Sequence, residues 1–173
     1  TVHISGGHIN PVVTIASMLT GRIGIRLGII YIVSQLVFAV VAVLLIKGLF
    51  PSVALEATHI GATTLNTAIA PWQGMLIEAF LTFFLVTAVW ANVTSTKVTS
   101  NQIVGFSIGL VIVFAILVGG PLTGASMNPA RTFGPALVGN FWVAHWIYWV
   151  GPLLGGLVAA VLYERVLLRT GAK

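Results

Sequence analysis

Two similar ten-residue stretches organise this sequence: SGGHINPVVT at residues 5–14 and TGASMNPART at residues 123–132. Each stretch contains glycine, reaches an Asn-Pro pair and continues into residues compatible with a helix. Asparagine is a favoured N-cap because its side-chain oxygen accepts from the first free N–H groups of a helix, and proline suits the first helical position because it lacks an N–H. The pattern predicts short helices from Pro11 to about Leu19 and from Pro129 to about Val138.

Four apolar stretches have the length needed to cross a bilayer as a helix, about 20 residues. They are Leu27–Ile46, Trp72–Ala91, Ile103–Gly119 and Trp142–Tyr163. Only 6% of the residues are charged and 58% are hydrophobic, whereas soluble domains are roughly a quarter charged. Four buried helices of a large soluble protein are the alternative, but so few charged residues could not cover a wet surface. The sequence therefore predicts an all-α membrane protein with four full spans.

The basic residues indicate the orientation of these spans. If the spans alternate in direction, one side of the membrane receives Arg22, Arg26, Lys97, Arg165, Arg169 and Lys173. The other side receives Lys47. The positive-inside rule then places the first group in the cytoplasm and makes residues 51–70 and 121–140 outer connections. The net charge of +5 does not indicate a nucleic-acid partner, because the orientation of the spans in the membrane explains these scattered basic residues more simply.

The two Asn-Pro stretches belong to an internal repeat. Residues 30–33 and 147–150 continue the similarity, and three spans separate the two Asn-Pro pairs, so the second copy is inverted. We interpret the chain as one domain, 1–173, with residues 1–50 as the remainder of the first repeat, 51–71 as an outer loop and 72–173 as the second repeat. The second copy contains two spans that the first lacks, and the chain does not open with Met. We therefore expect about two spans to precede Thr1.

Inverted repeats place a functional site near the midplane, where their broken helices meet. At about 1.5 Å per residue, each short helix covers ~15 Å, half of the ~30 Å hydrocarbon core. Such half-helices need burial in protein or contact with water, so we expect them to meet tip to tip. A capping Asn leaves its NH2 group free to donate. Asn10 and Asn128 together can then hold one water by its oxygen, which turns its hydrogens along the pore and interrupts a proton wire. The positive helix ends oppose cations, and carbonyls of residues 6–9 and 122–127 can form a ladder of acceptors.

With these features in place, the sequence resembles the aquaporins, or major intrinsic proteins. The resemblance is carried by the two Asn-Pro stretches, by Glu78 and by residues 145–152, and it extends from residue 3 to about 164. It implies a right-handed helical bundle with two inverted repeats, two re-entrant half-helices, one pore per subunit and a homotetramer in a plasma or vacuolar-type membrane. The implied pore residues are Asn10, Pro11, Val12, Asn128, Pro129 and Ala130. The implied selectivity filter contains Arg131, Ile116 and Ala125, with a fourth member on a helix before Thr1.

Two departures from the family pattern bear on selectivity. Val12 replaces the usual alanine of the first motif, so we expect added bulk near the midplane. Ile116 stands where strictly water-selective members often carry histidine, so the resemblance implies a less polar and wider filter. Thr132, Ala136 and the Tyr148-Trp149 pair nevertheless resemble the water-selective branch. The implied solutes are water and, as further candidates, ammonia, hydrogen peroxide and glycerol.

Several polar residues are candidates for supporting roles. Arg131 at membrane depth is costly and therefore a functional candidate. Glu78 is expected to accept from backbone N–H groups of the 119–127 loop, with proton relay as the alternative, and Gln35 is expected to bond a neighbouring loop. His8, Gly7, Gly124 and Ser126 are the remaining candidates for lining or supporting the pore.

The sequence gives little support to other functions. Cysteine is absent, which excludes thiol nucleophiles and thiolate metal sites. Ser126 and His145 lack an acidic residue to orient them, so we expect no catalytic residues, metal or cofactor and no enzyme activity. The predicted function is a passive channel for water and small neutral solutes that excludes protons and ions. A proton-coupled transporter and a non-conducting scaffold or adhesion relative are the alternatives.

Overall fold

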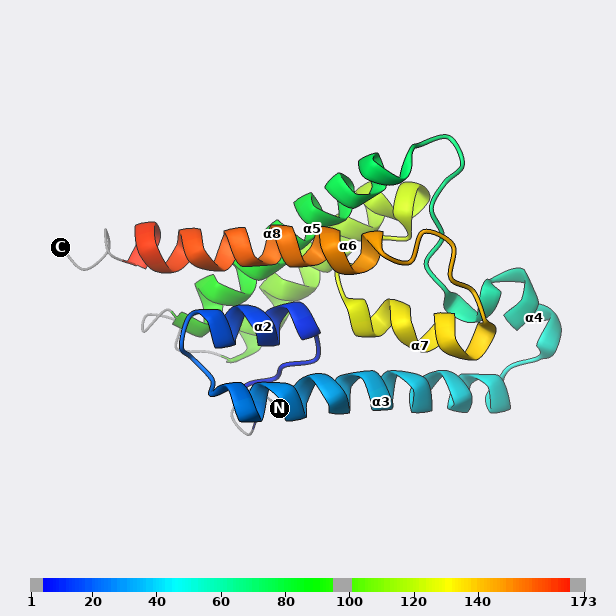
Figure 1. The fold of residues 1–173 in the computed structure, drawn as a ribbon, viewed down its shortest axis with the longest axis horizontal. Helices are drawn as coiled ribbons and strands as arrows, with labels where there is room; N and C mark the ends of the chain where they lie inside the picture. Colours follow the sequence, from blue (N-terminus) through cyan, green and yellow to red (C-terminus); the bar gives the residue numbers. More distant parts are fainter. Residues whose placement is uncertain (1–4, 95–100, 169–173) are drawn as a thin grey trace.

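The computed structural model describes residues 5–94 and 101–168, and the elements in this part of the chain are helical (Figure 1). In chain order they are α2 (Pro11–Leu19), α3 (Ile25–Leu49), α4 (Ser52–Ala57), the short 3-10 helix η1 (His59–Gly61), α5 (Pro71–Thr94), α6 (Asn101–Thr123), α7 (Pro129–Gly139), α8 (Ile147–Leu162) and a π-helical turn η2 (Tyr163–Leu167).

Four helices are long and apolar enough to cross a membrane, which confirms the predicted spans. Their qualifying segments are Ile25–Leu49, Pro71–Asn92, Gly105–Thr123 and Ile147–Leu167. The fourth begins five residues later than Trp142, where the sequence predicted it. Residues 143–146 form a turn in which Ala144 has a φ of 48°, and this left-handed conformation cannot continue a right-handed helix. The third span runs past Gly119 to Thr123 and keeps Pro121 inside its last turn.

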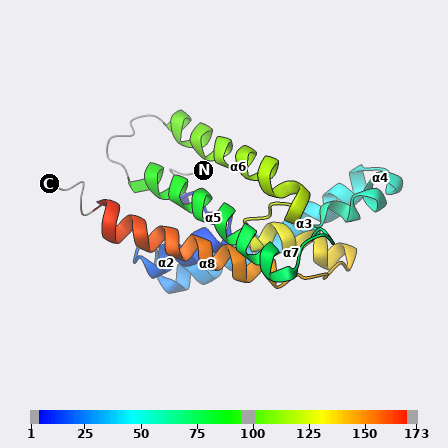
Figure 2. The same cartoon turned by 90° about the horizontal axis from the view of Figure 1, so that it is seen from above.

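Glycines allow α8 to lie directly on α5. A Cβ atom on Gly155 would stand 1.8 Å from the Ala79 carbonyl oxygen, and one on Gly151 would stand 2.5 Å from that of Met75. Small residues permit this close approach of two helix backbones. Figure 2 shows α5 between α8 and α6.

Each half-helix packs against the long helix of the other repeat. Val12 of α2 fits against Gly156 of α8, and Gly134 of α7 lies against the Ala39 backbone of α3. Figure 1 shows α2 and α7 end to end between α3 and α8. These two helix pairs are the equivalent contacts of the inverted repeat, because α2 corresponds to α7 and α3 to α8 in the sequence. The repeat therefore accounts for the whole central layer of the fold.

Basic residues gather at one end of the described structure. Arg22 follows α2 and pairs with Glu164 beyond α8, and Arg26 lies in the first turn of α3. Lys47 lies in the last turn of α3, at the opposite end of that helix. This distribution agrees with the predicted orientation, whereas Lys97, Arg169 and Lys173 lie outside the described residues. The cytoplasmic side itself stays a prediction.

Candidate pore

Asparagine caps begin both half-helices. Asn10 and Asn128 have extended backbones, with φ of −141° and −150°. The Asn10 side-chain oxygen accepts from the Val12 N–H at 2.9 Å. That of Asn128 accepts from Ala130 at 3.0 Å and from Arg131 at 3.3 Å. The local chemistry of Asn-Pro thus produces two helix tips, as predicted.

The two tips are joined by reciprocal hydrogen bonds. The Asn10 Nδ2 donates to the Met127 carbonyl at 2.8 Å, and the Asn128 Nδ2 donates to the Ile9 carbonyl at 3.0 Å. Each asparagine therefore bonds the residue that precedes the other one. The sequence predicted NH2 groups that are free to donate, and in the structure each of them donates to a carbonyl of the opposite loop. Since an amide carries two N–H donors, one remains on each side chain.

Paired tyrosines hold the loops that lead into the tips. The Tyr31 hydroxyl donates to the Ser5 carbonyl at 3.1 Å, and the Tyr148 hydroxyl donates to the Thr123 carbonyl at 2.8 Å. These residues are equivalent in the repeat, and Ser5 and Thr123 open the two matched stretches. Sequence reasoning used this tyrosine match only as a sign of repetition. The match was also a signal for a shared structural role.

Glu78 supports the second loop. Its Oε1 accepts from the Thr123 hydroxyl at 2.7 Å and from the Ser126 N–H at 2.9 Å, and its Oε2 accepts from the Met127 N–H at 2.8 Å. The loop turns sharply, with positive φ at Gly124, Ala125 and Met127. The carboxylate thus accepts hydrogen bonds from N–H groups that this turn leaves without helical partners. This matches the supporting role expected of Glu78.

Gln35 supports the first loop. Its Nε2 donates to the His8 carbonyl at 2.8 Å and to the Thr14 hydroxyl at 3.0 Å. The bond links α3 to both the approach and the body of the first half-helix. This is the contact with a neighbouring loop that the sequence predicted for Gln35.

A cavity of about 560 Å³ runs beside the two tips. One wall is α6, whose lining residues run from Gly105 to Ile116, a length of about 16 Å at the rise of an α-helix. The cavity brings together eight of the predicted site residues: Gly7, His8, Asn10, Ile116, Ala125, Ser126, Asn128 and Arg131. It therefore joins both asparagines to all three expected filter residues.

The remaining predicted site residues do not line this cavity. Val12 is fully buried in a cluster that includes Val86 and Trp90. The expected bulk near the midplane is therefore a wrong prediction: the side chain points into the protein, and Gly156 provides the space for it. Pro11, Pro129 and Ala130 are buried as well. Gly124 lies against Thr63, where a Cβ would stand 3.2 Å from the Thr63 backbone.

The connection between α4 and α5 holds Arg131. The Arg131 Nη1 donates to the Gly61 carbonyl at 2.8 Å. Nearby, the Thr63 hydroxyl bonds the Thr132 hydroxyl at 3.1 Å, which ties the same segment to α7. Gly61 has a φ of 84°, a conformation that glycine adopts without strain. The sequence predicted an outer loop here but not its contact with Arg131, and Gly61 was a local sign of a tight turn.

His145 lies just before α8 and outside the spanning segment. Partial burial lowers the pKa of its imidazole below the usual value. The neutral ring can then accept the hydrogen bond that Trp149 Nε1 donates to His145 Nε2 at 3.0 Å. This bond ties the turn before α8 to the first turn of that helix.

Comparisons with known proteins agree with this architecture. The family described as Major intrinsic protein matches residues 1–163. Aquaporin TIP4-4 of Zea mays is 41% identical over 98% of this chain and 66% of its own length, and probable aquaporin TIP3-2 of Arabidopsis thaliana is 44% identical over 96% and 61%. Aquaporin-4 of Mus musculus is 41% identical over 95% and 50%. The chain thus spans between half and two thirds of the length of these relatives.

A solved structure shares the fold. The X-ray structure of the aquaglyceroporin from Plasmodium falciparum superposes with a TM-score of 0.86 at 21% identity and covers 98% of this chain and 76% of that one. At this identity the likeness concerns the arrangement of the helices.

Proposed function

The chain belongs to the major intrinsic protein family, and from this membership we propose that it forms part of a passive channel for water. The family is one of channels and not of enzymes, and the chain is a multi-pass membrane protein. The proposed pore residues are those that line the cavity, with Asn10 and Asn128 at its middle and Arg131, Ile116 and Ala125 as its filter. Around it we propose a single domain, with residues 1–50 as the remainder of the first repeat, 51–71 as an outer loop and 72–173 as the second repeat.

The reciprocal asparagine pair beside the cavity is the observation that carries this proposal. Each amide has one N–H left after its bond to the opposite loop. Two such donors on one side of a narrow path orient a passing water by its oxygen. The positive ends of α2 and α7 face the same point and raise the free energy of any cation there.

The cavity wall supports a route for small neutral solutes as well as for water. Ile116 and Ala125 offer apolar surface, while Arg131 donates and carries charge. An apolar wall admits molecules slightly larger than water, whereas a fixed guanidinium repels cations. We therefore include ammonia, hydrogen peroxide and glycerol among the candidate solutes.

Proton coupling is the less favoured mechanism. A proton-coupled transporter needs a titratable group that can exchange protons with the path. Both oxygens of Glu78 already accept from a hydroxyl and two backbone N–H groups, and Glu78 does not line the cavity. The contacts of Glu78 therefore favour support of the loop over relay.

Stopped-flow light scattering on proteoliposomes tests the proposal. We expect osmotic water permeability above that of empty liposomes, with a low activation energy and no increase in proton conductance. Uptake of labelled glycerol and ammonia-driven pH changes in the same vesicles measure the solute range. Permeability at the lipid background would contradict the channel function.

Assembly can be measured on the same preparation. We propose a homotetramer on the basis of the family resemblance. Light scattering of the detergent-solubilised protein should give four times the protomer mass after subtraction of detergent, and a monomer mass would contradict it.

A further inference from the structure

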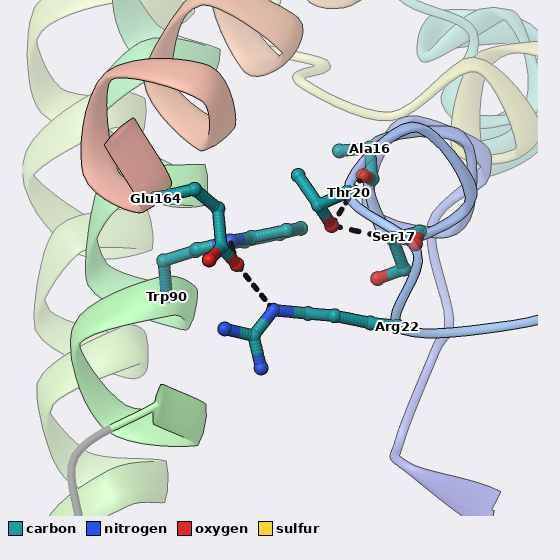
Figure 3. A network of polar contacts seen from close by, with 6 residues as sticks. All are labelled: Ala16, Ser17, Thr20, Arg22, Trp90 and Glu164. Atoms are coloured by element: carbon teal, nitrogen blue, oxygen red, sulfur yellow. Dashed lines mark hydrogen bonds and ion pairs between the residues drawn. The ribbon is translucent and has the colours of Figure 1, made fainter. Parts of the chain in front are cut away.

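Three elements meet at one carboxylate where α2 and α8 end. The Arg22 Nε donates to Glu164 Oε1, and the Trp90 Nε1 of α5 donates to the same oxygen at 3.0 Å. Figure 3 shows the guanidinium of Arg22 reaching from the loop after α2 to Glu164, with the Trp90 ring beside them. The Arg22 backbone N–H also donates to the Ser17 carbonyl at 2.8 Å. Arg22 is therefore held at both its backbone and its side chain.

Arg22 lies between this carboxylate and the cavity. Arg22 and Trp90 line the cavity, whereas Glu164 does not. The exposed fractions of the two side chains are 32% for Arg22 and 24% for Glu164. Both side chains are partly exposed, so solvent screens their charges in part, and removal of either one still changes the field at this mouth of the cavity.

Without Arg22, this mouth would attract cations. The C-terminal end of α2 carries the negative pole of its helix dipole. Glu164 adds a full negative charge a few residues beyond the end of α8. The guanidinium of Arg22 offsets both. Arg26 and Arg165 lie at the same end of the structure and are exposed, as Arg22 also is. Arg22 differs from them in the bond that holds its guanidinium against Glu164.

We propose that Arg22 is a specificity-determining residue at this second mouth, with Glu164 and Trp90 as the residues that position it. The pair keeps the mouth free of bound cations by placing a fixed positive charge between the carboxylate and the water path. The cavity thus has an arginine at each end, Arg131 held by Gly61 and Arg22 held by Glu164. This inference rests on the proposed function, because it takes the cavity as the path of water.

Terbium binding tests the charge argument without any measurement of flux. Bound Tb³⁺ beside an excited indole luminesces, and Trp90 is in direct contact with Glu164. In detergent solution, we expect Arg22→Gln to bind Tb³⁺ about tenfold more tightly than the unmodified protein, because a neighbouring positive charge is removed. The double variant Arg22→Gln/Glu164→Gln should return to the original weak binding. Arg26→Gln is the matched control, since it removes a positive charge at the same end without exposing Glu164.

The luminescence has two informative outcomes. Tighter binding in Arg22→Gln alone supports the proposal. Equal binding in Arg22→Gln and Arg26→Gln, or tight binding that persists in the double variant, overturns it.

Water permeability in proteoliposomes gives a second measurement. We expect millimolar Ca²⁺ to reduce the permeability of Arg22→Gln several-fold and to leave the double variant and Arg26→Gln unaffected. If the Arg22–Glu164 pair only held the two helix ends together, Arg22→Gln and the double variant would both have lower water permeability even without Ca²⁺. That result would overturn the proposal. If the unmodified protein conducts no water, the proposed function fails, while the terbium result still decides the charge role of Arg22.

Discussion

At the scale of single residues, the sequence predicted the local contacts of a side chain but not its hydrogen-bond partners far along the chain. The capping of α2 and α7 by Asn10 and Asn128 follows from Asn-Pro alone, because the cap contacts lie two or three residues away. The bonds of the same side chains to Met127 and Ile9 span more than a hundred residues. No local pattern indicates such a partner, although the inverted repeat implied that the two partners would be equivalent.

Val12 shows the limit of residue-level reasoning most clearly. Its position in the motif suggested bulk in the path of water, but the sequence does not show which side of a half-helix faces the cavity. We predict that Val12→Ala leaves water permeability and the solute size limit unchanged, because the side chain lies in the core against Gly156. The lost packing should cost about 1–3 kcal/mol of stability, measured as a lower midpoint of thermal unfolding in detergent. A wider solute range in this variant would place Val12 in the pore after all.

Arg131 should behave in the opposite way. We predict that Arg131→Val admits larger neutral solutes and cations, because it removes both the fixed charge and the volume that the bond to Gly61 holds beside Ile116 and Ala125. Glycerol uptake and cation leak in proteoliposomes measure the effect, with Val12→Ala as the control for general loosening. Unchanged selectivity in Arg131→Val would refute its filter role.

At the scale of elements, hydrophobic length predicted the spans, and backbone conformation corrected one boundary. Residues 142–146 have the composition of a span, but the positive φ of Ala144 prevents a continuous right-handed helix there. The helix α8 therefore begins at Ile147. The glycines of α8 indicate a close helix–helix contact, because small residues at helical spacing let two backbones approach each other. The identity of the partner helix, α5, came only from the structure.

The contact between α5 and α8 gives the sharpest prediction about stability. Gly155→Ala places a Cβ 1.8 Å from the Ala79 carbonyl oxygen, so the helix backbones must separate. We expect a loss of about 1–3 kcal/mol or more, the usual cost of overpacking a core, and a lower unfolding midpoint. Gly48→Ala, where an added Cβ meets nothing within 4 Å, is the matched control in α3. Equal stability of the two variants would contradict the close packing.

At the scale of the whole molecule, the cavity depends on parts that the sequence separates widely. Its lining comes from both approach loops, from both half-helices and from α5 and α6. The repeat predicted the meeting of the half-helices, and the resemblance implied which residues near them form the filter. The contact of Arg131 with Gly61 and the Arg22–Glu164 pair were not predicted, because each joins residues that are far apart in the sequence.

The absence of cysteine from the sequence allows a test of the path itself. Mercurials act on thiols, so we predict that they do not inhibit water flow through these residues. A thiol placed in the cavity should create inhibition, because a bound mercury atom there narrows the path. Ala125→Cys is suited to this, since Ala125 lines the cavity between Ile116 and Asn128. Stopped-flow permeability before and after mercuric chloride, and after a reducing thiol, measures the effect.

A cysteine elsewhere on the surface separates this mechanism from general damage by mercury. Val37 lies on α3, is 52% exposed and does not line the cavity, so Val37→Cys should bind mercury without loss of water flow. Reversible inhibition of Ala125→Cys alone would mean that water passes between the loop tips and α6. Equal inhibition of both variants would mean general damage by mercury. Inhibition of neither would mean that water follows another route, and the asparagine pair could then not be the point at which protons are excluded.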